Sequence, residues 1–311
     1  MTSALSINNL NYAYKSNWSL KRTPGLIDIK LNLEQGETFG FLGQSGAGKT
    51  TTIKCILGLL KPTRGEIKIF GEDATQAHAR RSVGYLPEQP YFYDHLSVKE
   101  TVAMFANLCG IPKSEVEKAS KLAISKVALD HKANSSLKSL SKGLTQRVAM
   151  AQAIVANPKL LILDEPFSGL DPLGRKEIAD LLFELRSKGT SIFMSSHILS
   201  DVESVCDRVS IMRGGRIKGI FEIDKIPEEF SDIKYELVIK TNGTSLDSLK
   251  KAAISHKEQG ELFYFYYGDS DLAQQKLQLA ISAGHLVESY SFTRPNLEDI
   301  FVKLTKESGD N

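Results

Sequence analysis

The order of apolar and polar residues along the chain predicts a fold in which strands and helices alternate. Residues 37–42 form a short apolar run, and residues 160–163 form a continuous one that is typical of a strand buried on both faces of a parallel sheet. Residues 27–33 alternate between apolar and polar side chains, which predicts a half-buried strand. Apolar residues at helical spacing predict helices over residues 51–60 and 171–189. Together these elements are typical of the α/β class.

A change of pattern near Ile226 predicts a domain boundary. We expect residues 1–226 to form a first domain, with a mainly helical insertion at about residues 91–150, and residues 227–311 to form a small α+β domain. The aromatic run at residues 263–267 could stack on nucleic-acid bases, but a packed sheet face explains it better. The second domain is predicted to alternate strand and helix three times, over residues 235–240, 246–254, 262–267, 271–283, 286–292 and from Asn296 onward.

Residues 43–50 lie between the strand predicted at residues 37–42 and the helix predicted at residues 51–60. They read GQSGAGKT and match the phosphate-binding pattern G-x-x-x-x-G-K-[ST]. Gly46 and Gly48 allow successive backbone N–H groups to point at an anion. Lys49 supplies a charge for the β- and γ-phosphates, the Thr50 hydroxyl can ligate Mg²⁺, and the following helix points its positive dipole end at the same place. The order strand, loop, helix is the context that this motif requires. The residues predicted to bind a nucleotide here are Gly43, Gln44, Ser45, Gly46, Ala47, Gly48, Lys49, Thr50 and Thr51.

Two carboxylates, Asp164 and Glu165, follow the continuous apolar run. Ligands of parallel sheets bind at the carboxyl ends of the strands, and acids are costly to bury there unless a cation or a reaction needs them. We therefore expect Asp164 to hold Mg²⁺ and Glu165 to accept a proton from the attacking water. Asp171 is the expected N-cap of the helix over residues 171–189, and the strand-like run after that helix carries His197 to the same edge.

Residues 140–147, which read LSKGLTQR, resemble the LSGGQ signature of ABC ATPases. Ser141 and Gly143 are retained, whereas Lys142 and Leu144 depart from the pattern. Apolar residues continue at helical spacing after Ser141, so the first N–H groups of this helix can face an anion.

The other motifs of ABC ATPases occur in the family's order. Gln89 resembles the glutamine of the Q-loop, Asp171 ends a stretch similar to the D-loop, and His197 resembles the switch histidine. Tyr14 is placed like the aromatic residue that stacks on adenine, although Tyr12 is close enough to compete.

The resemblance covers roughly residues 5–220 and implies a P-loop ABC ATPase cassette with a helical insertion, followed here by the small α+β domain. ATP and Mg²⁺ are the implied cofactors. The implied catalytic residues are Glu165, His197 and Gln89, and the implied ligands of Mg²⁺ are Thr50, Gln89 and Asp164. Outside the phosphate loop, the implied contacts to ATP are Tyr14, Ser141, Gly143 and Asp171.

The family completes each ATP site with the signature of a second chain. The resemblance therefore implies a second ATP-binding subunit, in a homodimer, and an integral membrane permease on a separate chain, reached from the cytoplasmic face of the membrane. Residues 294–301 resemble the tail of ATP-binding subunits in bacterial drug, antibiotic and polysaccharide exporters, which favours export. Of the three aromatic rings at residues 91–93, in the region that receives the permease in this family, we expect at least one to be exposed.

Two alternatives within the family stay open. The first is a soluble ABC ATPase that acts on ribosomes or DNA; the single cassette, and the lack of a heptad run between Lys49 and Asp164, argue against it. The second is a regulatory cassette that binds ATP without hydrolysis, which the intact Glu165 and His197 argue against.

Composition agrees with these expectations and adds a few exclusions. A net charge of +2 and a pI near 8.2 predict no nucleic-acid partner on bulk charge. Three scattered cysteines favour a reducing compartment. Neither a signal peptide nor an apolar run near the ~20 residues of a membrane span is expected. The remaining histidines have no metal-ligand spacing and are expected to be structural or exposed: His78, His95, His131, His256 and His285.

Overall fold

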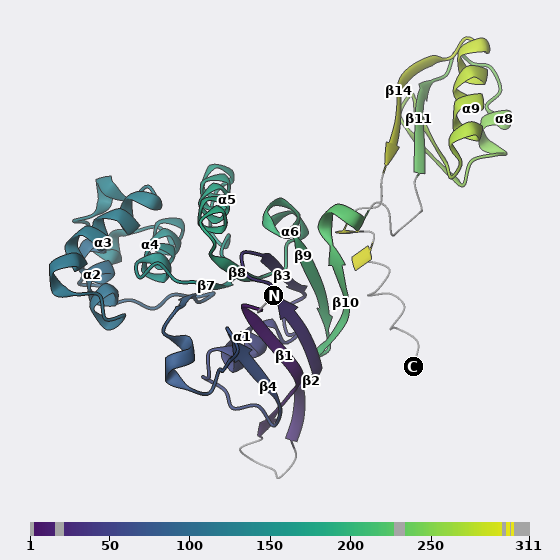
Figure 1. Ribbon diagram of the computed structural model, residues 1–311. Helices are drawn as coiled ribbons and strands as arrows, with labels where there is room; N and C mark the ends of the chain where they lie inside the picture. Colours follow the sequence, from purple (N-terminus) through teal and green to yellow (C-terminus); the bar gives the residue numbers. More distant parts are fainter. Residues whose placement is uncertain (1–2, 16–21, 227–233, 294–296, 299, 302–311) are drawn as a thin grey trace. The chain divides into compact units, whose positions relative to one another are not determined.

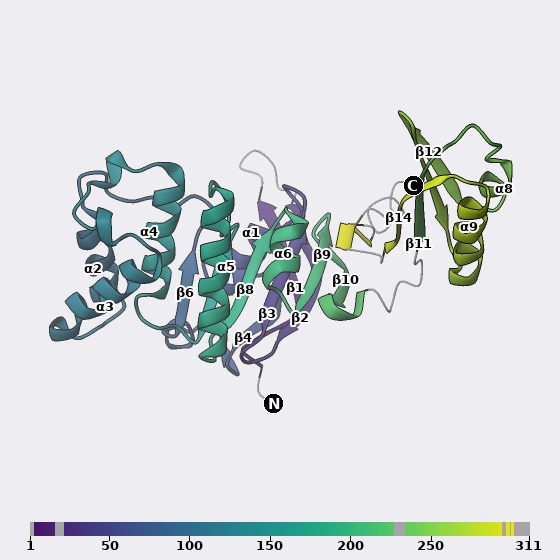
Figure 2. The ribbon, with the colours of Figure 1, turned by 90° about the horizontal axis from the view of Figure 1, so that it is seen from above.

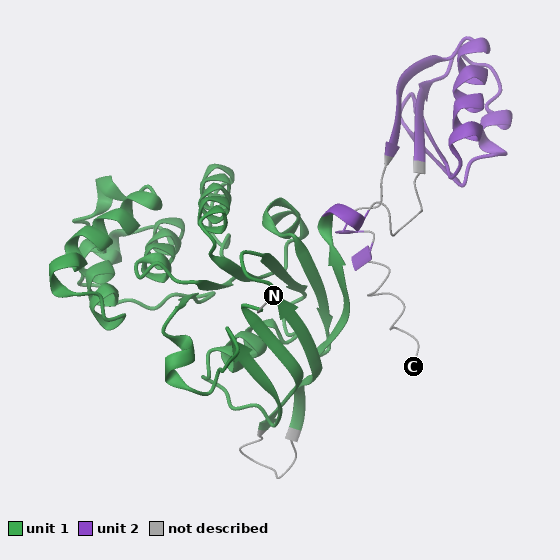
Figure 3. Ribbon diagram, viewed as in Figure 1, with its two compact units in different colours: residues 1–223 green, residues 224–311 purple. Residues whose placement is uncertain are grey.

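The computed structural model describes residues 3–15, 22–226, 234–293, 297–298 and 300–301. The chain divides into two compact units, residues 1–223 and residues 224–311 (Figure 3). This division falls a few residues before Ile226, where the sequence pattern changes.

A six-stranded sheet forms the centre of the first unit, in the order β10-β9-β3-β8-β7-β6. Its strands run parallel except β10, which forms a hairpin with β9 through Gly214 and Gly215, both at positive φ. Every residue of β3, β7 and β8 is buried, as expected for central parallel strands. The strands are β3 (Thr38–Gly43), β6 (Val83–Leu86), β7 (Leu160–Asp164), β8 (Ser191–Ser196), β9 (Arg208–Arg213) and β10 (Arg216–Glu222).

Helices cover both faces of this sheet. On one face, α5 (Pro172–Ser187) and α6 (Leu199–Val205) pack on β8 and β3 (Figure 2). On the other face, α1 (Lys49–Ile56) lies between β3 and a second, antiparallel sheet in the order β2-β1-β4-β5. An apolar core joins both sheets and α1. The second sheet contains β1 (Leu5–Lys15), β2 (Arg22–Leu33), β4 (Arg64–Ile69) and β5 (Glu72–Asp73), and the short helix η1 (Ala77–Arg80) follows it.

A helical region lies between β6 and β7 in the chain. It stands beside the edge of the six-stranded sheet that β6 forms (Figure 1). Its helix α4 begins after Ser141, whose hydroxyl accepts a hydrogen bond from the Leu144 N–H at 3.3 Å. The region contains α2 (Val98–Leu108), α3 (Lys113–Lys126), η2 (Asp130–Lys132), η3 (Leu137–Ser139) and α4 (Lys142–Ile154).

Two helices of the first unit differ in how closely they follow the prediction. Helix α5 starts as predicted, with Asp171 accepting a hydrogen bond from the Gly174 N–H at 2.8 Å and with Pro172 at its first position. Helix α1 was predicted to continue to Leu60 but ends at Ile56. Gly58, which precedes Pro62, adopts a φ of 69°, the left-handed conformation that ends helices.

The second unit is a four-stranded antiparallel sheet in the order β12-β13-β11-β14, with α9 packed on it. Phe265 and Tyr267 of the aromatic run are fully buried in its core. The element order β-α-β-β-α-β corrects the prediction, because the helix expected over residues 246–254 is only α8 and a strand, β12, follows it. The helix expected from Asn296 begins outside the described residues. The elements are β11 (Lys234–Lys240), α8 (Asp247–Lys250), β12 (Ser255–Gln259), β13 (Leu262–Tyr267), α9 (Ser270–Ser282) and β14 (Leu286–Thr293), and η4 (Ile223–Lys225) spans the division between the units.

None of the helices in the described ranges has the length and apolar character that a membrane span requires.

Candidate functional site

The loop between β3 and α1 has the geometry of an anion cradle. Gly46 and Gly48 adopt φ values of 79° and 114°, which side chains rarely allow. A Cβ added at Gly48 would lie only 2.6 Å from the Met212 Cε atom and 2.9 Å from the Leu26 Cδ2 atom, so these buried side chains would have to shift. Gly48 caps α1 without a side-chain hydrogen bond, which leaves the first amides of the helix to a ligand.

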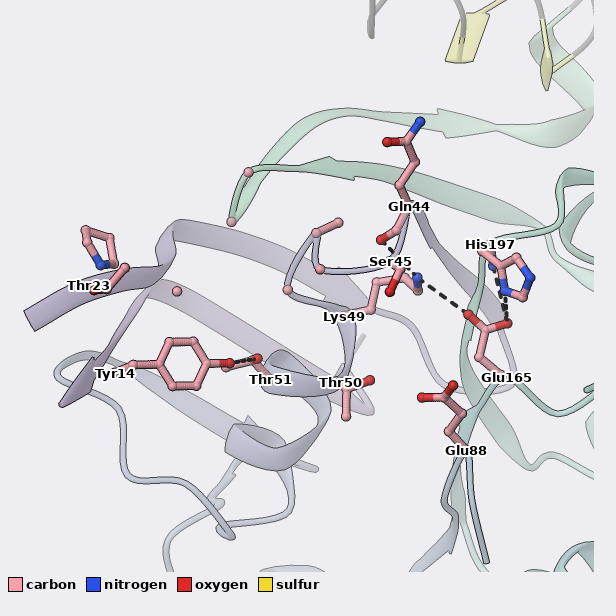
Figure 4. Close-up of a pocket in the computed structure, with 17 residues that line it drawn as sticks. Tyr14, Thr23, Gln44, Ser45, Lys49, Thr50, Thr51, Glu88, Glu165 and His197 are labelled. Carbon is pink, nitrogen blue, oxygen red and sulfur yellow. Dashed lines mark hydrogen bonds and ion pairs between the residues drawn. The ribbon is translucent and has the colours of Figure 1, made fainter. Parts of the chain in front are cut away.

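This loop borders a pocket of about 620 Å³ at the carboxyl ends of the central strands (Figure 4). Most of the predicted nucleotide-binding and catalytic residues line it: Tyr14, Gln44, Ser45, Gly46, Ala47, Gly48, Lys49, Thr50, Thr51, Glu165 and His197. Six lining residues had no motif to reveal them: Thr23, Pro24, Gly25, Glu88, Gly214 and Gly215. They come from the start of β2, the segment after β6 and the turn of the β9–β10 hairpin, which only the fold brings to the loop.

Lys49 and His197 hold the carboxylate of Glu165 between them. The Lys49 ammonium lies 3.5 Å from Glu165 Oε1 and donates to the Gly43 carbonyl at 2.6 Å. The His197 Nδ1 atom lies 2.8 Å from Glu165 Oε2, and the backbone N–H of His197 donates to the same oxygen at 3.3 Å. Lys49 and Glu165 are both buried, so water screens their attraction weakly. A phosphate bound to Lys49 would therefore lie beside this carboxylate.

The backbone of Glu165 is strained. Its φ is 53°, a left-handed value that costs a non-glycine residue about 1–3 kcal/mol. The N–H of Glu165 donates to the carbonyl oxygen and to the hydroxyl of Ser195, each at 3.2 Å. The conformation turns the chain away at the end of β7 and directs the carboxylate toward Lys49 and His197 (Figure 4).

Asp164 has the surroundings of a cation ligand. Its Oδ1 atom accepts a hydrogen bond from the Ser195 hydroxyl at 2.5 Å, whereas Oδ2 is buried and has no hydrogen-bond partner among the described residues. Burial raises the pKa of Asp164, and the nearby hydroxyls of Ser195 and Thr50 and the charge of Lys49 oppose that rise. An unpaired buried carboxylate oxygen near a threonine hydroxyl is a donor set that suits Mg²⁺.

Tyr14, and not Tyr12, lines the pocket. The Tyr14 hydroxyl lies 2.5 Å from the Thr51 hydroxyl, and the two tyrosine rings pack edge to face with centroids 5.1 Å apart. Tyr12 packs against the apolar core instead. Gly25 lies so close to the Tyr14 ring that a Cβ there would be 2.5 Å from Cε2. The geometry thus favours Tyr14 for the predicted stacking on a base.

Six predicted residues do not line the pocket in the described part of the chain. Gly43 and Asp164 are buried at the ends of β3 and β7. Gln89 is exposed, and its neighbour Glu88 lines the pocket instead. Ser141 and Gly143 lie at the start of α4, and Asp171 caps α5. The exposed start of α4 suits the contact that the resemblance implies for Ser141 and Gly143, to ATP bound by a second chain.

Comparison with known proteins gives consistent results. The family described as ABC transporter matches residues 26–168. The bacitracin transport ATP-binding protein BcrA of Bacillus licheniformis is 35% identical over 288 residues, covering 89% of this chain and 90% of that protein. The Nod factor export ATP-binding protein I of Cupriavidus pinatubonensis is 30% identical over 285 residues, covering 89% and 85%. A solved structure of the ATP-binding subunit of an ABC transporter is 32% identical, with a TM-score of 0.66, and covers 79% of this chain and 97% of that one.

Proposed function

Because the chain belongs to the ATP-binding subunits of ABC transporters, which are ATPases, we propose that it powers an integral membrane permease on a separate chain and that the transport is export. The observation that carries the catalytic part of this proposal is the Lys49–Glu165–His197 arrangement beside the phosphate loop. Export is supported by the Nod factor export protein among the relatives. The subunit would then lie at the cytoplasmic face of the membrane.

The proposed chemistry follows from the positions of these side chains. Lys49 and the amides of the phosphate loop would bind the β- and γ-phosphates of ATP. Glu165 would accept the proton of the attacking water, and His197 would orient the carboxylate and contact the γ-phosphate. Electrostatic stabilisation and positioning supply most of the rate in phosphoryl transfer. The Gly43 carbonyl holds Lys49, Ser195 holds the backbone N–H of Glu165, and the two side chains hold each other, which suits this role.

We propose that Thr50 and Asp164 hold Mg²⁺, with Gln89 joining them when the nucleotide is bound. The ion would neutralise charge on the β- and γ-phosphates. Asp164 must be charged for this role, while burial raises its pKa. The affinity for Mg²⁺ should therefore fall, as pH is lowered, at a higher pH than for an exposed aspartate. Titration of Mg²⁺ into the ATP-bound protein at several pH values measures this. An Asp164→Asn variant with unchanged affinity would contradict the assignment.

The exposed rings after Gln89 are the proposed anchor for the permease. Tyr91 is 99% exposed and Tyr93 62% exposed, which confirms the expectation that at least one ring is free. Phe92 packs edge-on to Phe105 at 6.1 Å between centroids and belongs to the helical region. Large exposed aromatics are typical anchors of interfaces because they bury much area with few rotatable bonds.

We expect Tyr91→Ala to weaken association with the permease by about tenfold or more and to leave nucleotide affinity of the isolated subunit unchanged. Co-purification of the subunit with its permease, followed by measurement of the dissociation constant, tests this. Phe183→Ala is the matched control, because that ring is 44% exposed on α5. If Tyr91→Ala binds like the wild type, or if no membrane protein co-purifies with the wild type, the docking proposal is wrong.

A further inference from the structure

Gln146 connects the signature helix to the catalytic carboxylate. It lies in α4, it is only 3% exposed, and its Nε2 atom is 3.2 Å from the carbonyl oxygens of both Glu165 and Pro166. A side-chain amide carries two N–H donors, so one Gln146 side chain can satisfy both carbonyls. These are buried contacts between segments far apart in the sequence.

The hydrogen bond from Gln146 holds the carbonyl of Glu165, the residue with the strained backbone. The N–H of Glu165 is already held by Ser195, and Gln146 holds its carbonyl. A left-handed backbone at a non-glycine residue persists only where its surroundings determine it on more than one side. With both peptide groups held, the Glu165 side chain has one direction to follow, toward Lys49 and His197.

The start of α4 packs against Gly169, in the segment that follows Glu165. A Cβ added at Gly143 would lie 2.9 Å from the Gly169 carbonyl oxygen. The aliphatic part of Lys142 lies over Gly169, where a Cβ would be 2.9 Å from its Cγ and Cδ atoms. Helix α4 is thus in close contact with the segment that runs from Glu165 to Gly169, so a shift of the helix would move that segment with it.

We propose that Gln146 is a positioning residue that holds Glu165 in its catalytic orientation from the signature helix. The proposal rests on the proposed role of Glu165 as the base. Gln146 is not among the residues that line the pocket; it acts through the backbone of Glu165.

The test replaces the donor by an apolar side chain of similar size. Gln146→Leu leaves two buried carbonyls without their partner and should let the Glu165 backbone relax. We expect kcat to fall about tenfold to a hundredfold, the effect of a small misplacement of a reacting group, with ATP affinity within about twofold of the wild type. Gln152→Leu is the matched control, because it makes the same change on the same helix and lies outside the contact with Glu165.

A second measurement does not depend on turnover. The ring of His197 contacts Glu165 Oε2 at 2.8 Å, so its NMR resonances report the position of that carboxylate. They can be assigned in histidine-labelled protein by comparison with His197→Gln. We expect them to shift in Gln146→Leu, in the folded chain without nucleotide, and to stay in place in Gln152→Leu.

A merely structural role for Gln146 would lower the unfolding temperature without moving the His197 resonances or kcat, and that result would overturn the proposal. So would a loss of ATP affinity as large as the loss of kcat. If the wild type itself does not hydrolyse ATP, the proposed function fails, whereas the His197 resonances still decide whether Gln146 positions Glu165.

Discussion

Glu165→Gln is expected to abolish ATP turnover while leaving ATP binding intact. The amide has the shape of the carboxylate but cannot accept the proton of the attacking water, and loss of a general base typically lowers rate by about a hundredfold to ten-thousandfold. The phosphate loop, Lys49 and Tyr14 keep their side chains, and Lys49 loses only its ion pair with Glu165, so affinity should persist. An ATP-bound pair of chains that cannot hydrolyse should accumulate, which light scattering would detect as a doubled mass on addition of ATP.

The matched control is Glu88→Gln, since Glu88 is the second carboxylate that lines the pocket among the described residues. Glu88 is exposed, whereas Glu165 is 8% exposed and contacts both Lys49 and His197. The control should keep most of the activity. Near-normal hydrolysis by Glu165→Gln, or an equal loss in the control, would remove Glu165 from the role of base.

The second large effect concerns the composite site. Ser141→Arg places a long charged side chain at the exposed start of α4, where the resemblance puts the partner chain's ATP. Hydrolysis should be lost, and the nucleotide affinity of each single chain should stay unchanged because Ser141 does not line its own chain's pocket. Lys49→Ala should be inactive for the opposite reason, loss of its own phosphate contact. A mixed dimer of the two variants retains one site with Lys49 and Ser141 both intact, and activity should return to part of the wild-type rate.

Ser141→Ala separates this effect from helix damage. It removes the hydrogen bond to the Leu144 N–H, at a cost of about 1 kcal/mol, without adding bulk. It should therefore be far more active than Ser141→Arg. If differently tagged chains demonstrably form mixed dimers and these stay inactive, the composite arrangement is wrong.

The sequence predicted those parts of the site that depend on local patterns. The phosphate loop is a contiguous motif, and Asp164, Glu165 and His197 follow buried parallel strands, whose carboxyl ends meet at one edge. Contacts that depend on tertiary packing could not be predicted from local patterns. Gln146 touches Glu165 across the chain, and the glycines of the β9–β10 turn reach the pocket only because β9 pairs with β3.

Two errors in the fold have physical causes as well. Strand β12 is an edge strand of five exposed residues, Ser255 to Gln259, so it shows no alternation between apolar and polar side chains. The apolar residues before it were therefore assigned to a helix over residues 246–254, whereas α8 ends at Lys250. Helix α1 ends at Ile56, two residues before Gly58, whose left-handed conformation the helical spacing of apolar residues does not reveal.

The most direct test of the account is the dependence of ATP hydrolysis on protein concentration, measured over the range in which light scattering shows the wild-type chain passing from monomer to dimer. If two chains complete each site, the rate per chain should rise with the dimer fraction and level off when that fraction is complete, and Glu165→Gln should be inactive throughout. A rate per chain that stays constant across the transition, or the absence of hydrolysis by the dimer, would contradict the account.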